Sequence, residues 1–364
     1  HFGSGTFRTY GFDGEVALTA TDGAFYEGEG IFDVGGAALS LTTPFLVDLG
    51  KDGVPRSGAV QPNLEIRTTG SVLIAAPAGA AVSAPTSPAA PGARLAIGAL
   101  AAPVEQLTID GALLRATAGR IDVNAAGDVA LVNAAELATP TYAKDFGDAA
   151  DLVHVTAPGG TISLASLSGD IEVGTNAILA IGGLSGKAGA VELIASDGLV
   201  TLDGTLDAAT PAHGADLLLD TGTGSFDLTG FFDSYGAEFT GDVMIRTGIG
   251  DLVVDADQVL RLGSLQLTAD GGWTEVAGSV DTSGVNGGDI TLQGRDGVRL
   301  AGTAVLDAHA DGYSDTDTRQ AAAGDVILGA GESGAIEVAT GATIDLGVRR
   351  TDNRLVAQTR TDPR

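Results

Sequence analysis

The chain has 364 residues, 44% of them hydrophobic, which is enough to bury a sizeable core and is not the composition of a disordered protein. Its formal net charge is -28, so long-range repulsion disfavours nucleic acid as a partner. The absence of cysteine excludes disulfides, zinc–thiolate sites and cysteine nucleophiles. The sequence contains no unbroken apolar run of about 18 residues, so no transmembrane helix is predicted.

A short glycine-led strand pattern recurs along the chain. It consists of glycine, any residue, Val or Ile, any residue, and then Leu, Ile or Val, so apolar side chains alternate with period two. The pattern begins at Gly14, Gly70, Gly119, Gly127, Gly160, Gly169, Gly189, Gly241, Gly288, Gly324 and Gly334. With 55 glycines but one Trp and five Tyr, the core must be thin and repeated, built from many small aliphatic side chains.

In chain order, the pattern predicts β-rich coils over residues 1–74 and then a Pro- and Ala-rich loop excursion over residues 75–104. Strands resume at Leu107, within a repeat shaft that spans residues 105–346. Residues 347–364 are expected to form an Arg-rich tail or a connection to the next coil.

Two stretches, 189–208 and 288–308, show how the strands succeed one another. Each contains three short strands separated by glycine turns, and each ends in Leu-Asp-Ala. Because side chains on a strand alternate between its two faces, one set is predicted to point inward. These residues are Val191, Leu193, Val200, Leu202 and Leu206 in the first stretch, and Ile290, Leu292, Val298, Leu300 and Leu306 in the second.

The turns favour stacked coils over other β arrangements. Asp-Gly pairs such as Asp110-Gly111 and Asp270-Gly271 are expected to supply the positive φ of a sharp corner, although hairpins use the same pairs. Strands of three to five residues are too short to fill a sandwich, and no long amphipathic helical pattern supports an α/β fold. Coils with three short faces pair every strand except those at the two ends, so we predict an all-β, three-faced solenoid with loop excursions.

The repeats resemble those of a known protein family. The units 280–292 and 297–302 resemble the repeat shafts of filamentous-haemagglutinin-like large exoproteins, and the likeness covers about residues 105–346. It implies a right-handed parallel β-helix exported by two-partner secretion through an outer-membrane partner of a Gram-negative bacterium. The family's export domain carries Asn-Pro-Asn-Leu, which differs by one residue from Gln61-Pro62-Asn63-Leu64, where a proline turn is the simpler interpretation.

The predicted function is structural or adhesive, with no enzymatic activity. Such a shaft is expected to be secreted or displayed at the cell surface, and to bind a host or neighbouring-cell surface or other copies of itself. The alternative is a carbohydrate-active β-helix, a polysaccharide lyase or hydrolase, with Arg295, Asp296 and Arg299 near Asp270 as outward-facing candidates. Salt-bridged surface charge is the favoured interpretation of these residues, and the chain lacks the aromatic platforms that a sugar-binding groove usually needs.

Calcium is the only cofactor that the sequence suggests, although a solvated turn is the favoured interpretation of its candidate loop. Its candidate ligands are the acidic residues Asp307, Asp311, Asp315 and Asp317, although His309 stands where an EF-hand loop needs Asp or Asn, and Thr318 where it needs Glu. A smaller acidic cluster comprises Asp145, Asp148 and Asp151. The four histidines, His1, His154, His213 and His309, show no metal-ligand spacing, so each is expected to be an exposed loop residue.

The two ends of the chain suggest that it is part of a longer protein. The sequence starts at His1 without a signal segment, and the repeats run close to both ends. Five arginines fall in the last sixteen residues, where a solvated loop before the next coil is favoured over a processing region or an acidic-surface contact. They are Arg349, Arg350, Arg354, Arg360 and Arg364.

Overall fold

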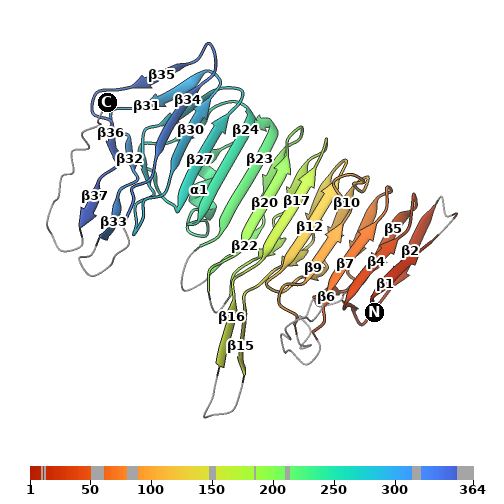
Figure 1. The fold of residues 1–364 in the computed structure, drawn as a ribbon. Helices are drawn as coiled ribbons and strands as arrows, with labels where there is room; N and C mark the ends of the chain where they lie inside the picture. Colours follow the sequence, from red (N-terminus) through yellow and green to blue (C-terminus); the bar gives the residue numbers. More distant parts are fainter. Residues whose placement is uncertain are drawn as a thin grey trace, which may run out of the picture. The chain divides into compact units, whose positions relative to one another are not determined.

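The protein is an all-β chain arranged in parallel sheets (Figure 1). The computed structural model describes residues 1–9, 11, 14–50, 61–79, 89–146, 153–183, 186–209, 214–313 and 321–350. Two compact units comprise His1–Gly224 and Ser225–Arg364. In both units, consecutive strands belong in rotation to three sheets, and we use "coil" for one set of three such strands.

The first unit contains three parallel sheets and one hairpin. Its first sheet comprises β1 (Gly5–Arg8), β4 (Glu29–Asp33), β7 (Asn63–Arg67), β9 (Arg94–Ile97), β12 (Arg120–Ala125), β17 (Thr161–Ser166), β20 (Ala190–Ala195) and β23 (Asp216–Ser225). The second comprises β2 (Glu15–Thr19), β5 (Ala38–Thr42), β8 (Val72–Ala75), β10 (Leu107–Asp110), β13 (Val129–Val132), β18 (Ile171–Val173) and β21 (Val200–Leu202). The third comprises β3 (Ala24–Tyr26), β6 (Phe45–Asp48), β11 (Leu113–Arg115), β14 (Glu136–Ala138), β19 (Ile178–Ala180) and β22 (Thr205–Asp207). The antiparallel hairpin comprises β15 (Tyr142–Phe146) and β16 (Val153–Ala157).

The second unit repeats this arrangement after a short helix, α1 (Leu228–Tyr235). Its first sheet comprises β24 (Asp242–Ile249), β27 (Ser264–Ala269), β30 (Ile290–Gly294) and β34 (Val326–Ala330). The second comprises β25 (Leu252–Val254), β28 (Trp273–Val276), β31 (Gly297–Leu300) and β35 (Ala335–Val338), and the third β26 (Val259–Arg261), β29 (Ser279–Asp281), β32 (Val305–Asp307) and β36 (Thr343–Asp345). Two further strands, β33 (Ala310–Tyr313) and β37 (Val348–Arg350), pair in parallel.

Aliphatic columns run through the coils, and their residues pair directly from strand to strand. In the first unit, Val191 pairs with Ile162 on one side and Leu217 on the other. In the second, Leu292 pairs with Leu267 and Leu328. Of the ten residues predicted to point inward, nine are buried and Leu202 is half-buried, so the predicted register is confirmed. Each fully buried aliphatic side chain stabilises the fold by roughly 1.5–3 kcal/mol before entropy is counted.

Glycine at the start of the first-sheet strands allows the coils to approach closely. A Cβ added to Gly160 would lie 2.0 Å from the carbonyl oxygen of Gly119, and one added to Gly189 would lie 1.9 Å from that of Gly160. Neither Gly160 nor Gly189 has a positive φ, so lack of space between coils, and not backbone conformation, selects glycine here. This stacking explains why the glycine-led pattern recurs.

Several sequence-based expectations need correction. Gly111 has the expected positive φ of 64°, but Gly271 does not, and a Cβ there would meet the Gly248 carbonyl oxygen at 2.6 Å. The predicted loop excursion over 75–104 contains a complete strand, β9, whose Leu95 and Ile97 are buried. Strands also exceed the expected three to five residues, reaching ten in β23 and eight in β24. Within the predicted Arg-rich tail, residues 348–350 form β37.

Candidate functional site

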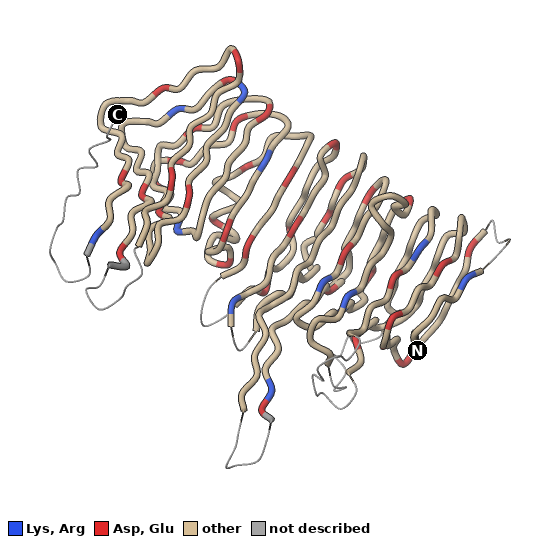
Figure 2. The backbone as a smooth tube through the Cα atoms, in the orientation of Figure 1, with Lys and Arg blue, Asp and Glu red and all other residues tan. Residues whose placement is uncertain are grey.

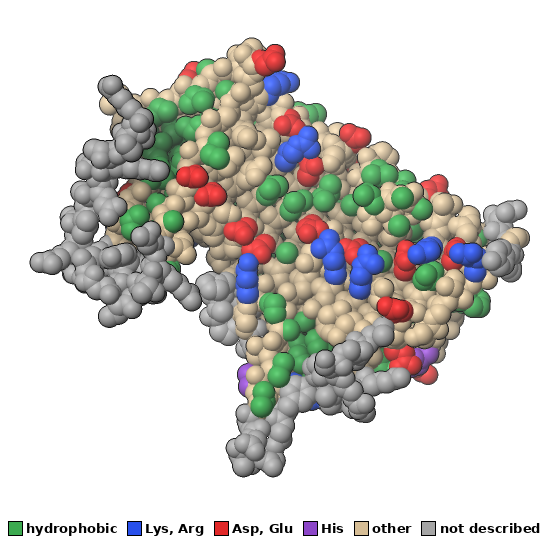
Figure 3. Space-filling model, viewed as in Figure 1, with side chains coloured by type: hydrophobic (Ala, Val, Ile, Leu, Met, Phe, Trp, Pro, Cys, Tyr) green, Lys and Arg blue, Asp and Glu red, His purple; other side chains and the backbone are tan. Residues whose placement is uncertain are grey.

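A band of paired charges lies on the first sheet of the first unit. Figure 2 shows basic and acidic positions on neighbouring strands there, and Figure 3 shows their side chains side by side on the surface. Its ion pairs are Arg8–Asp33 at 2.7 Å, Arg67–Glu65 at 2.6 Å, Arg94–Asp122 at 2.8 Å and Arg120–Glu192 at 2.8 Å. The hydrogen bond from Arg67 holds the pKa of Glu65 below its usual value. Each of these arginines contacts a carboxylate, so the band is a neutralised surface.

A buried ion pair connects three segments inside the first unit. Asp48 has no exposed surface, and its Oδ1 lies 3.1 Å from the Nε of Arg115 and accepts a hydrogen bond from the Thr117 hydroxyl. Its Oδ2 accepts a hydrogen bond of 2.6 Å from the Ala90 amide. Burial, followed by the charge of Asp48, raises the pKa of Tyr26 well above its ordinary value. Because every acceptor is satisfied locally, this network serves the packing of the coils.

The residues of the enzyme hypothesis are engaged in contacts with their neighbours. Arg295 contacts Asp296 at 3.1 Å, and Asp270 contacts Arg246 at 2.5 Å. Arg299 lies 2.8 Å from Glu337, contacts Glu275, and stacks over the Trp273 ring with its guanidinium carbon 4.4 Å from the ring centroid. The structure therefore brings Arg299 together with two carboxylates and an aromatic ring. By contrast, Arg295 pairs with Asp296, and Asp270 pairs with Arg246.

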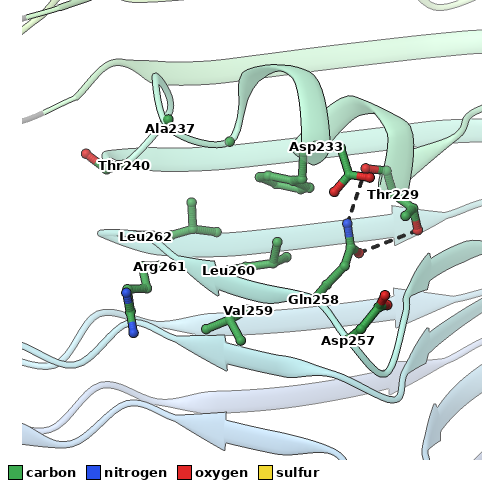
Figure 4. A pocket seen from close by; sticks show the side chains of 12 residues that line it. Thr229, Asp233, Ala237, Thr240, Asp257, Gln258, Val259, Leu260, Arg261 and Leu262 are labelled. Atoms are coloured by element: carbon green, nitrogen blue, oxygen red, sulfur yellow. Dashed lines mark hydrogen bonds between the residues drawn. The ribbon is translucent and has the colours of Figure 1, made fainter.

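A groove of about 420 Å³ lies between helix α1 and the residues of β26 and the turn before it (Figure 4). Phe232, Leu260 and Leu262 are buried at its lining, whereas Asp233 and Asp257 are exposed. The side chain of Gln258 is buried and donates a hydrogen bond of 3.2 Å to the Thr229 carbonyl oxygen.

Aromatic side chains gather beside this groove. The Phe231 ring packs within 5.8 Å, centroid to centroid, of the rings of Phe226, Phe232, Tyr235 and Phe239. Phe231, Phe232 and Phe239 are buried, so these rings form a small core beneath the helix and offer no flat exposed platform.

The predicted calcium loop is only partly described. Asp307 ends β32 and Asp311 belongs to β33, whereas Asp315 and Asp317 lie outside the described residues. Of the smaller acidic cluster, Asp148 and Asp151 also lie outside them. Asp145 contacts the exposed His154 across the β15–β16 hairpin.

His309 is buried, which contradicts the expectation of an exposed loop histidine. It is 5% exposed, its Nδ1 contacts the Oδ1 of Asp307, and its Nε2 lies 3.1 Å from the Oδ1 of Asp311. Burial lowers the pKa of the imidazole, but the carboxylates of Asp307 and Asp311 outweigh this effect, so the pKa is raised overall. By contrast, His1 and His154 are exposed as expected, and His213 lies outside the described residues.

Asp345 joins this cluster from the next coil. One ligand atom each from Asp307, His309 and Asp345 lies within 4.8 Å of the other two, an arrangement that can hold a metal ion. Asp307 and Asp345 pair directly in the register of β32 and β36. Sequence reasoning missed Asp345, although Ile344-Asp345 repeats Leu306-Asp307 and could have marked the same position in the next coil.

Comparison with known proteins places the chain in no family. No family model, curated protein or solved structure gave a significant match. Among the described residues, no helix is long and apolar enough to span a membrane.

Proposed function

We propose that the chain is a structural and adhesive segment of a secreted or cell-surface bacterial exoprotein, folded as a right-handed parallel β-helix. The observation that carries the proposal is the rotation of consecutive strands among three parallel sheets, with aliphatic columns in register. A chain that visits three faces in turn closes into a solenoid, and parallel connections within a sheet are right-handed in about 98% of proteins. The resemblance to filamentous-haemagglutinin-like exoproteins suggests export through an outer-membrane partner.

The surface chemistry supports display over catalysis. In the charged band, each arginine is neutralised by a carboxylate, and Arg299 forms ion pairs with both Glu275 and Glu337. A net charge of -28 keeps such a shaft solvated and repels other polyanions. The proposed partners are a host or neighbouring-cell surface, or other copies of the chain.

Protease treatment of intact producing cells tests the proposed location. If the segment is displayed, externally added protease removes an epitope on the exposed β15–β16 hairpin while a periplasmic control protein stays intact. An epitope that is lost only after the outer membrane is permeabilised would place the segment inside the cell envelope and contradict display.

The alternative function is a carbohydrate-active β-helix, and Trp273, Glu275, Arg299 and Glu337 are the residues that favour it. An aromatic ring beside carboxylates and a cation is a usual element of sugar sites. The test incubates the purified chain with acidic and neutral polysaccharides and follows release of reducing ends. Release that Glu275→Gln abolishes and Glu332→Gln leaves unchanged would replace the structural proposal with the enzymatic one. Glu332 is an exposed residue outside this group.

A further inference from the structure

His309 stands among three carboxylates that come from two successive coils. Asp307 and Asp311 flank it in the chain, and Asp345 reaches it from β36. The imidazole is 5% exposed, so water does not compensate for contacts that its nitrogens lack.

The two imidazole nitrogens have different surroundings. Nδ1 forms a hydrogen bond with the Oδ1 of Asp307, which fixes the orientation of the ring. Nε2 is fully buried and forms no hydrogen bond with a described residue, although the Oδ1 of Asp311 lies only 3.1 Å away. The direction from the ring to Asp311 does not suit a hydrogen bond, so this polar atom is left unsatisfied beside a negative charge.

A bound metal ion would satisfy both the Nε2 of His309 and the carboxylate of Asp311. Zinc binds imidazole nitrogen and carboxylate oxygen at about 2.0–2.2 Å, so two of its ligands in a tetrahedral site lie about 3.3 Å apart. The 3.1 Å between the Nε2 of His309 and the Oδ1 of Asp311 is close to that value. An ion bound to both atoms lies off the line that joins them, so the ring nitrogen does not have to point at Asp311 as it would in a hydrogen bond.

We propose that the Nε2 of His309 and the carboxylate of Asp311 bind a divalent transition-metal ion of the zinc class. Asp307 is a positioning residue that holds the ring through Nδ1, as a carboxylate does behind many metal-bound histidines. Asp345 adds a third negative charge to the cluster. An imidazole ligand favours zinc and its neighbours in the first transition row, whereas calcium takes six to eight oxygens.

Arg349 is the one described cation that opposes metal binding in this cluster. Its guanidinium contacts the carboxylate of Asp345, whose other oxygen accepts a hydrogen bond from the Gly347 amide. When this positive charge is removed, the negative charge of Asp345 attracts the metal ion more strongly. Arg349→Gln should therefore strengthen zinc binding, an effect opposite to that of ligand removal.

Zinc titration of the metal-free chain, followed by calorimetry, tests the proposal. The chain carries no histidine tag and has His1 replaced by alanine, because a terminal histidine chelates metals by itself. We expect one zinc ion per chain, an affinity at least tenfold lower in His309→Gln and in Asp311→Asn, and no displacement by millimolar calcium. Asp311 is exposed, so its substitution should leave folding intact even if His309→Gln unfolds the region.

His154→Gln is the matched control. His154 also contacts an aspartate, Asp145, but both are exposed, so this variant should bind zinc as the parent does. Cobalt gives a second measurement, since a tetrahedral site with a nitrogen ligand produces intense visible absorption that His309→Gln should remove. Unchanged zinc affinity in both His309→Gln and Asp311→Asn, or loss of binding in His154→Gln alone, would overturn the proposal. Absence of any zinc binding would also overturn it.

Discussion

The first and last coils of the second unit carry the same kind of inward column, but within the described part of the chain only the first is covered. In the first coil, Val254 is fully buried and Leu260 is 4% exposed. At the corresponding positions of the last coil, Val338 is 55% and Ile344 is 42% exposed. The chain continues the same pattern in both places, so the neighbour in space decides whether an aliphatic side chain is buried.

Helix α1 is the neighbour that covers the first coil. It packs against β25 and buries Leu228, Phe231 and Phe232. Solenoids need terminal units that differ from the repeat, because a coil exposes its column wherever no further coil follows. Among the described residues, no comparable element covers the last coil, whose exposed column is the kind of surface that another coil or another chain would bury.

The largest loss of stability is expected in an interior coil, and it serves as the reference for substitutions in the first and last coils. Leu292→Asp should destabilise the second unit by several kcal/mol, because Leu292 has no exposed surface and an aspartate there would be an unpaired buried charge. Thr291→Asp, on the opposite face of the same strand, should change stability by less than about 0.5 kcal/mol. The single tryptophan, Trp273, lies in this unit and reports its unfolding in urea by fluorescence. If both variants unfolded at the same urea concentration, the inward register would be wrong.

The second prediction addresses the two ends directly. Phe232→Ala should cost roughly 3 kcal/mol, because it removes a buried ring between α1 and the first coil. Ile336→Ala, on the last coil, should cost less than about 1 kcal/mol, since that side chain is already 50% exposed. Urea unfolding followed through Trp273 compares them. Equal losses would mean that the last coil is covered in solution.

The columns were predictable from the sequence, whereas the covering of their ends was not. Period-two alternation identifies Val191 and Leu292 as inward, because both faces of a strand follow from its local geometry. Helix α1 has only eight residues, too few for a clear helical period, and it was not predicted.

The candidate site was only half predictable for the same reason. Asp307 and Asp311 stand near each other in the sequence, but the burial of His309 and its approach to Asp345 depend on a coil more than thirty residues further along the chain. Likewise, Asp48 meets Arg115 across 67 residues, a separation that no local pattern encodes. Pairing between coils is therefore the information that a single sequence lacks.

A smaller effect should appear at the N-terminus of α1. Asp227 caps the helix, and its Oδ1 accepts a hydrogen bond of 3.0 Å from the Gly230 amide. Asp227→Ala should lower the stability of the second unit by about 1 kcal/mol. Asp233→Ala removes the same charge from an exposed position on the same helix and serves as the control. If the control lost as much stability as the cap variant, lost charge and not lost capping would explain the change.

The smallest expected effect is the cost of burying an ionised carboxylate in an interior coil, compared with an exposed carboxylate on the last coil. Burial, followed by the charge of Asp207, raises the pKa of Glu136 on β14. A raised pKa means that ionisation costs more in the folded state, so the penalty is absent below the unfolded pKa of about 4.3 and grows as the pH rises through the folded pKa. Glu136→Gln should therefore stabilise the first unit by less than about 1 kcal/mol at pH 7, and this gain should shrink as the pH falls toward 4. Thermal unfolding followed by circular dichroism measures the gain, with Glu332→Gln on the exposed last coil as the control that should give none at either pH. A gain at Glu136 that did not depend on pH would show that packing of the amide, and not the cost of burying a charge, separates interior coils from exposed ones.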